Sequence, residues 1–189
     1  MRVAGASFLG PGLAVLAFGV GVSALTLLSL GQDHPSFTCT EWSARLAPAL
    51  AIYPISIEKY GRWRTGFWTA ALCAYLLHFW WAVAVTYRFD FEAIAARQGW
   101  VAYANYAVTV IWTADVLLGF SPLGRGLVGQ LVRPLAWASV SAAFIGATAV
   151  FRSGAAAVAG WAVLALLIGA LIARLLGYRI QTQDQAPAA

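Results

Sequence analysis

Long apolar runs, separated by short charged segments, limit what this chain can fold into. Residues 8–30 contain no charged side chain, and further apolar runs cover residues 66–87, 100–120, 135–151 and 155–176. An α-helix crosses the hydrocarbon core of a bilayer with about 20 mostly apolar residues. These runs lack the alternation of apolar and polar residues that marks the strands of a membrane barrel. They therefore predict an all-α polytopic transmembrane helix bundle with five spans.

The composition excludes the other broad classes of protein. Hydrophobic residues make up 61% of the chain and charged residues 10%, whereas about a quarter of a soluble domain is charged. Disordered chains have the opposite bias. The first run is longer than the apolar core of a signal peptide, so we expect a retained helix. We predict one transmembrane domain over residues 1–176 and a polar cytoplasmic tail over residues 177–189.

Two segments are harder to assign from the pattern. Residues 42–57 are apolar, but the segment is short and contains Arg45, Pro48 and Pro54. We expect an interfacial or re-entrant helix there, with a short, kinked sixth span as the alternative, because ~30 Å of hydrocarbon needs more residues. The run at 135–151 is also short and follows Pro134. It is therefore expected to stand nearly upright in the membrane.

The basic residues predict the orientation of the chain. With five spans, eight Lys and Arg side chains lie on one side and four on the other, and a six-span arrangement gives the same counts. The richer side is cytoplasmic. Both arrangements place the C-terminus in the cytoplasm, and they differ on the side of the N-terminus and of the His34 loop.

The composition also bears on the source and partners of the chain. A chain rich in Arg and Ala favours a bacterial cytoplasmic (inner) membrane protein. The sequence lacks a basic patch with interleaved aromatic residues, so nucleic-acid binding is not expected.

Asp115 lies inside the predicted span at residues 100–120, near its cytoplasmic end. An ionisable group there costs at least ~2.5–3.5 kcal/mol to insert and usually faces protein or water. One interpretation is an ion pair that ties this helix to a neighbour, and another is proton or cation handling. A contact with a partner subunit is a third. The arginines on the same side include the structural ion-pair candidates Arg64, Arg125 and Arg174.

His78 lies beside an aromatic cluster in the run at residues 66–87, where Trp80 and Trp81 follow it. A neutral histidine bonded to a carbonyl or hydroxyl is the structural interpretation. The functional alternatives are a haem shared with a second chain, a quinone contact or a proton relay. The tryptophans can stack on a pigment, quinone or lipid chain, although such aromatics usually face lipid. No cofactor is assigned from the sequence.

The run at residues 100–120 has a polar face formed by Asn105, Thr109 and Trp112 at helical spacing. Interhelical hydrogen bonds are the structural interpretation, and a cavity for a small ligand or ion is the functional one. The last two runs carry small residues four apart, which let helices approach closely in lipid. These two small-residue faces consist of Ala138, Ala142 and Gly146, and of Ala165, Gly169 and Ala173.

Recognisable catalytic motifs are missing. Gly124, Gly126 and Gly129 have the spacing G-x-G-x-x-G, but they follow a membrane helix rather than a strand, so a dinucleotide site is not expected. We assign no catalytic residue and no metal ligand. The sequence favours an integral subunit or accessory protein of a larger membrane complex, in contact with lipid and partner subunits. The alternatives are a small transporter that uses an intramembrane Asp, and a membrane enzyme or cofactor binder acting on a lipid or quinone.

Overall fold

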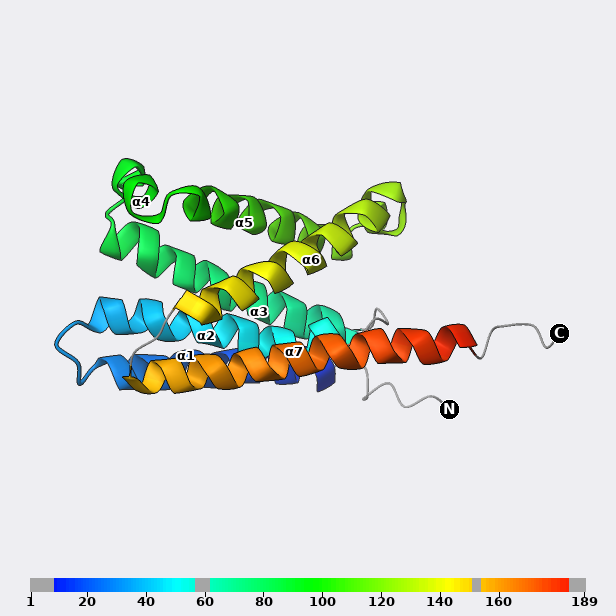
Figure 1. The fold of residues 1–189 in the computed structure, drawn as a ribbon, viewed down its shortest axis with the longest axis horizontal. Coiled ribbons are helices and arrows are strands. Elements are labelled where there is room, and N and C mark those ends of the chain that lie inside the picture. Colours follow the sequence, from blue (N-terminus) through cyan, green and yellow to red (C-terminus); the bar gives the residue numbers. More distant parts are fainter. Residues whose placement is uncertain (1–8, 57–61, 151–153, 184–189) are drawn as a thin grey trace.

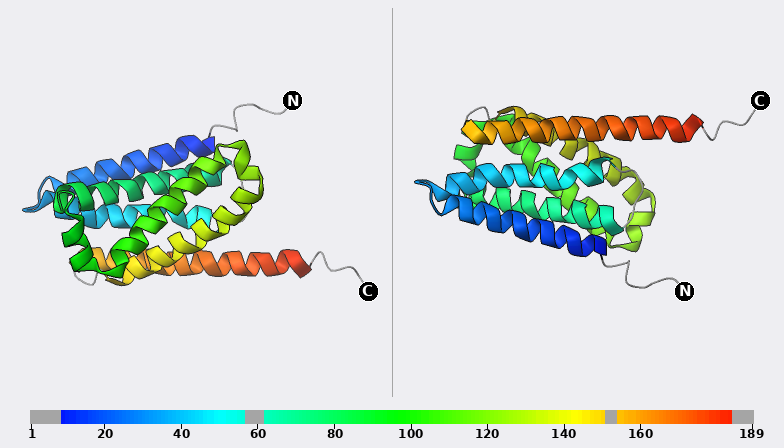
Figure 2. Two further views of the ribbon diagram at one scale, coloured as in Figure 1. Left: turned by 90° about the horizontal axis from the view of Figure 1, so that it is seen from above. Right: turned by 90° about the horizontal axis from the view of Figure 1, so that it is seen from below.

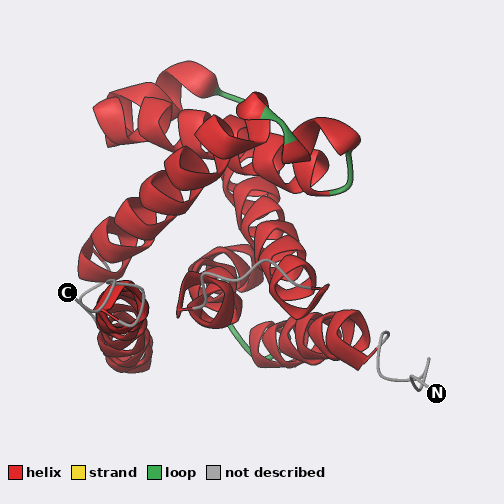
Figure 3. Ribbon diagram, turned by 90° about the vertical axis from the view of Figure 1, so that its right-hand side faces the viewer, coloured by secondary structure: helices red, strands yellow, loops and turns green. Residues whose placement is uncertain are grey.

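The computed structural model describes residues 9–56, 62–150 and 154–183. Within these ranges the regular elements are all helices, without strands (Figure 3). The long helices are α1 (Leu9–Ser29), α2 (Pro35–Ser56), α3 (Arg62–Trp80), α5 (Trp100–Gly119), α6 (Leu127–Val150) and α7 (Gly154–Gln183). Shorter elements are a π-helix, η2 (Trp81–Thr86), the helix α4 (Phe91–Gln98) and a 3-10 turn, η3 (Pro122–Arg125). The expectation of an all-α chain is confirmed for the described residues.

Four of the described helical segments are long and apolar enough to cross a membrane. They are Pro11–Ser29, Trp63–Thr86, Trp100–Gly119 and Leu127–Ala147, and α7 adds the shorter apolar segment Gly160–Arg174. These segments correspond in order to the five predicted runs. A helical membrane bundle is therefore supported by four to five helices.

The helix α2 differs from its prediction. It has 22 residues and begins at Pro35, whereas the sequence indicated a short segment starting at residue 42. It lies lengthwise beside α1 and packs on α3 and α7, rather than lying across the helix ends (Figures 1 and 2). Ser43, Ala51 and Ile55 are fully buried. The helix α2 is therefore part of the bundle, but it is not among the segments that are long and apolar enough to cross a membrane. Whether it is an interfacial, re-entrant or sixth spanning helix stays a prediction.

The helix α6 also differs from its prediction. It begins at Leu127, has 24 residues and contains Pro134 in its interior, whereas the sequence placed a boundary at this proline. A proline removes one backbone donor, a loss that membrane helices tolerate when neighbouring groups satisfy the freed carbonyl. Because the helix is longer than the predicted run, it can tilt and still have enough residues to cross a membrane. It is inclined to α7 (Figure 1), and its expected upright orientation in the membrane stays a prediction.

Successive long helices run in opposite directions (Figures 1 and 2). The start of α1, the end of α2, the turn η3 and the end of α7 consequently lie at one end of the bundle. We call this the basic end, because the described side chains there include Arg64, Arg125, Arg133 and Arg174. The α1–α2 connection and α4 lie at the opposite end, which we call the α4 end.

The core is built around Trp112, a fully buried residue of α5. Its ring lies 4.9 Å from that of Trp68, 5.5 Å from that of Tyr75 and 5.6 Å from that of Phe144, measured between centroids. These contacts join α3, α5 and α6. Aromatic pairs at such separations are worth about 0.5–1.5 kcal/mol beyond their buried area, so this stack holds together helices that are distant in sequence.

The α4 end is closed by short structured elements. Asp90 caps α4, and its carboxylate accepts a 2.9 Å hydrogen bond from the amide of Ala93. Ile94 of α4 is buried against Val83 of the π-helix and Ala102 of α5. Asp90 is thus accounted for as a helix cap, a role that short acidic side chains commonly have.

Candidate functional site

Asp115 is almost completely buried, with 2% of the residue exposed. Its Oδ2 accepts a 2.8 Å hydrogen bond from the indole Nε1 of Trp68 in α3. Its Oδ1 lies 4.0 Å from Nε of Arg133 in α6, and the charge of Arg64 acts on the same carboxylate. The carboxylate therefore links α3, α5 and α6 near the basic end, as expected of a group that ties helices together.

The three predicted arginine partners of Asp115 have different surroundings. Arg64 is buried and contributes to the charge around Asp115, but its Nε donates to the carbonyl of Pro54 at 3.2 Å. Arg174 donates to the carbonyl of Ile55 at 3.3 Å. Arg125 is exposed in the turn η3. Arg133, which directly precedes Pro134 in α6, makes the ion pair with Asp115.

The buried C-terminus of α2 accepts hydrogen bonds from Arg64 and Arg174. The carbonyls of Pro54 and Ile55 lie in the last turn of α2, where a helix lacks intrahelical donors. Arg64 caps the first, while Arg174 and the indole of Trp137 cap the second. The Arg174 guanidinium also lies 4.4 Å from the centroid of the Trp137 ring. Cations are favourable at a helix C-terminus, so these arginines fasten α2 to α3 and α7.

The polar face predicted on α5 is used within the bundle. The Tyr75 hydroxyl donates to the carbonyl of Asn105 at 3.1 Å, and the Thr109 hydroxyl lies within 2.7 Å of that carbonyl and 3.3 Å of the Tyr75 hydroxyl. Trp112 is in the core. Tyr75 of α3 thus contacts Thr109 and the backbone carbonyl of Asn105, while Trp112 packs on α3 through its ring and its indole Nε1 has no hydrogen-bond partner among the described residues.

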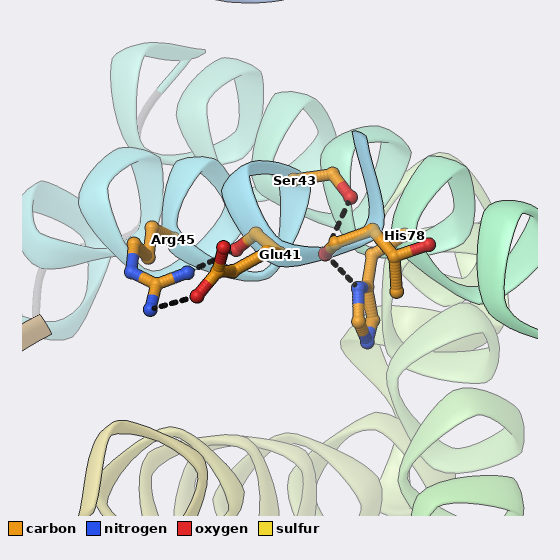
Figure 4. Close-up of polar contacts among 5 residues, drawn as sticks. Glu41, Ser43, Arg45 and His78 are labelled. Carbon is orange, nitrogen blue, oxygen red and sulfur yellow. Dashed lines mark hydrogen bonds and ion pairs between the residues drawn. The ribbon is translucent and has the colours of Figure 1, made fainter. Parts of the chain in front are cut away.

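His78 faces α2. Its Nδ1 lies 2.8 Å from the carbonyl oxygen of Thr40, which also accepts a 3.1 Å bond from the Ser43 hydroxyl (Figure 4). This is the type of contact that the structural interpretation of His78 predicts. Trp80 is 57% exposed on the next turn, and Trp81 is partly exposed at the start of the π-helix. The histidine and Trp80 therefore do not converge on one ligand.

An ion pair that the sequence did not reveal lies on α2. Arg45, 5% exposed and halfway along this helix, donates to Oε1 of Glu41 at 3.4 Å and to the Glu41 backbone carbonyl (Figure 4). The Arg45 guanidinium also lies 5.7 Å from the Trp42 ring. Glu and Arg four residues apart are neighbours on a helix, which is the sequence signal. The Glu41–Arg45 pair was not predicted, because α2 was expected to lie at the membrane surface.

The small-residue faces of α6 and α7 are exposed. All six of their members lie on the outside of the bundle, and the two helices contact each other through other residues, including Val140, Phe144 and Leu167. A side chain added at Gly146 or Gly169 would meet nothing within 4 Å. The two small-residue faces therefore do not pack on each other within the described chain.

The glycine pattern at residues 124–129 has a backbone explanation. A Cβ at Gly124 would lie 2.0 Å from the carbonyl oxygen of Leu118, and one at Gly129 would lie 2.1 Å from that of Gly124. These glycines let the chain turn tightly between α5 and α6. Among the described residues, no group of three or more His, Cys, Asp or Glu side chains could hold a metal ion.

No protein-family model, curated protein or solved structure matches this chain.

Proposed function

We propose that this chain is an integral subunit or accessory protein of a larger membrane complex, which it joins through α6 and α7. The observation that carries this proposal is the open space over Gly146 and Gly169 on two exposed small-residue faces. In lipid, such faces let another helix approach the backbone closely, and dispersion contacts with that helix drive association. The same surfaces have no neighbour within the described chain.

The interior supports the same proposal. The carboxylate of Asp115, the hydroxyls of Tyr75 and Thr109, and the guanidinium of Arg174 all make contacts between helices of the chain itself. These groups stabilise the bundle. A scaffold in which these four groups bind other helices of the same chain, and whose small-residue faces are open, is suited to assembly.

We further propose that the basic end faces the cytoplasm of a bacterial cell, with both the start of α1 and the end of α7 on that side. The described arginines of this end support the orientation, since cytoplasmic segments of membrane proteins carry an excess of Lys and Arg.

Leucine substitutions at the open glycines test the assembly. Gly146→Leu and Gly169→Leu place a bulky side chain where nothing of this chain is present, so the bundle itself is expected to fold normally. Gly19→Leu, on α1, is the matched control because its added Cβ also meets nothing within 4 Å. The chain is purified in a mild detergent from its native membranes, and the mass and composition of its complex are measured.

The expected result is a complex with reproducible partner chains that Gly169→Leu or Gly146→Leu dissociates and Gly19→Leu leaves intact. Recovery of this chain from native membranes as a stable monomer, without partner chains, would overturn the proposal. Two differently tagged copies, expressed together, reveal self-association, and a complex made solely of this chain would also contradict an accessory role.

A second candidate function, a small carrier for protons or charged solutes, is favoured by the position of the Glu41–Arg45 pair. Arg45 is buried halfway along α2, and the Glu41 side chain is 21% exposed. Intramembrane ionisable groups often mark ion or substrate pathways. This moves the carrier hypothesis from Asp115, whose carboxylate is held by Trp68 and Arg133, to Glu41.

Flux through purified protein tests the carrier. The chain is reconstituted into liposomes that contain a pH-sensitive dye, and proton uptake is followed under an imposed gradient. A carrier predicts flux that Glu41→Gln abolishes and that Glu92→Gln, an exposed residue of α4, leaves unchanged. Equal leakage from protein-containing and empty liposomes would reject proton transport.

A further inference from the structure

An open groove runs along the outside of the bundle at the basic end. It has a volume of about 610 Å³ and lies between α1, α3 and the end of α5 with the turn η3. Clefts of roughly 300–1,000 Å³ are the usual size for binding small molecules. The groove opens where α1 presents several of its exposed apolar side chains to the surroundings, including Val15 and Leu16.

The charged side chain of the groove lies at its basic end, and most of the remaining lining is apolar. Arg125 and Thr65 line it close to the basic end, where η3 and the first turn of α3 lie. Val15, Phe18 and Ala70 line it farther along the helices. From Thr65 to Cys73 the lining follows α3 for eight residues, which corresponds to about 12 Å at 1.5 Å per residue.

The charge of this lining selects the kind of ligand. Among the described residues that line the groove, Arg125 alone carries a formal charge, and its side chain is exposed. It lies in η3, shortly beyond the apolar segment Trp100–Gly119, and a residue that follows the end of a membrane-spanning helix comes to the depth of lipid headgroups. Basic pockets between membrane helices bind anionic headgroups, and guanidinium groups match phosphate geometry well.

We propose that this groove binds one anionic phospholipid, with its phosphate against Arg125 and an acyl chain along Val15 and Phe18. The polarity gradient of the groove follows that of the lipid, from charged headgroup to hydrocarbon. The lipid covers the part of α3 that α1 and α5 leave exposed at the basic end, including Cys73.

Native mass spectrometry of the delipidated protein in detergent tests the site. The protein is titrated with phosphatidylglycerol or with phosphatidylcholine of the same acyl chains. We expect one phosphatidylglycerol to bind at least about fivefold more tightly than phosphatidylcholine, the factor that one arginine near a membrane surface supplies. Arg125→Gln removes this preference and Arg125→Lys retains most of it, while Arg97→Gln, at the α4 end, has no effect.

A second variant tests the groove itself. Gly119 lines the groove, and a Cβ there would meet nothing within 4 Å, so Gly119→Leu introduces a side chain into the groove from a position where its first atom has room. It is expected to weaken binding of both lipids, whereas Gly19→Leu leaves both unchanged. Equal affinity for the two lipids in the unaltered protein, or a phosphatidylglycerol preference that survives Arg125→Gln, would overturn the headgroup assignment. If Gly119→Leu does not weaken the binding of either lipid, the groove is not the binding site.

Discussion

The indole of Trp68 donates a 2.8 Å hydrogen bond to the carboxylate of Asp115, across 47 positions of sequence. Both residues are almost fully buried, at 2% exposure each. The bond joins α3 to α5 directly beside the aromatic stack around Trp112. It assigns the most conspicuous acid of the sequence to a contact that holds the bundle together.

Removing the donor should destabilise the protein. Trp68→Phe keeps an aromatic ring but leaves a buried carboxylate oxygen without its partner, which costs about 1–3 kcal/mol. The free energy of unfolding in mixed detergent micelles measures this loss. Trp63→Phe, at a residue that is 39% exposed on the same helix, is the control and should change it little. Equal effects of the two substitutions would show that the hydrogen bond contributes nothing.

Changing the carboxylate should reveal coupling between the two residues. Asp115→Asn removes the charge that faces Arg133 and Arg64. Removing one partner of a fully buried ion pair lowers the free energy of unfolding by about 3–5 kcal/mol, and this is the upper limit of the effect expected here. In a double-mutant cycle, Trp68→Phe and Asp115→Asn should be non-additive by at least about 0.5 kcal/mol. Strict additivity would argue against a direct interaction. Proton flux that disappears in a fully stable Asp115→Asn variant would assign the acid to transport.

The cap on α2 predicts a second stability effect. Arg174→Gln removes a charged donor to Ile55 and the contact with the Trp137 ring. We expect a loss of about 1–3 kcal/mol in the free energy of unfolding, since hydrogen bonds to charged groups are among the stronger ones. Arg97→Gln, an exposed arginine on α4, is the matched control. If the two variants unfold alike, the α2 terminus does not depend on Arg174.

The turn between α5 and α6 predicts a steric effect. Gly124→Ala would place a methyl group 2.0 Å from the Leu118 carbonyl, whereas the Cβ of Gly126→Ala would lie an ordinary 3.5 Å from that of Leu123. The first substitution should lower the yield and the melting temperature markedly, because the backbone must shift. The second should leave both nearly unchanged. A Gly124→Ala protein as stable as its control would mean that the turn has another conformation.

The direction of the helices predicts a topology. The start of α1 and the end of α7 lie at the same end of the bundle, and the α1–α2 connection lies at the other (Figure 1). In a background of Cys39→Ala and Cys73→Ala, single cysteines are introduced as Gln32→Cys and Gly126→Cys. On intact bacterial cells, a membrane-impermeant maleimide should label position 32 and spare position 126. Labelling of 126 alone, or of neither position, would favour a different orientation or an α2 that does not cross.

Local sequence was sufficient where a helix is apolar along its whole length. The run at residues 100–120 predicted α5 to within one residue at its end, and residues 8–30 did the same for α1. The local pattern failed at α6, where Pro134 suggested a boundary, and it gave too short a segment for α2, which contains Pro48 and Pro54. At the end of α2, Arg64 and Arg174 from neighbouring helices donate to carbonyls that the helix terminus leaves without intrahelical donors.

By itself, the sequence determined that the chain is a bundle of apolar helices, because the burial of some 20 successive apolar residues in lipid is a local property. Only the tertiary structure decided that Asp115 binds Trp68, that Arg174 caps α2 and that Glu41 and Arg45 lie within the bundle. Those outcomes depend on which helices lie side by side and in which direction. Hydropathy does not contain that information, because an apolar residue that faces lipid and one that faces another helix have the same hydropathy.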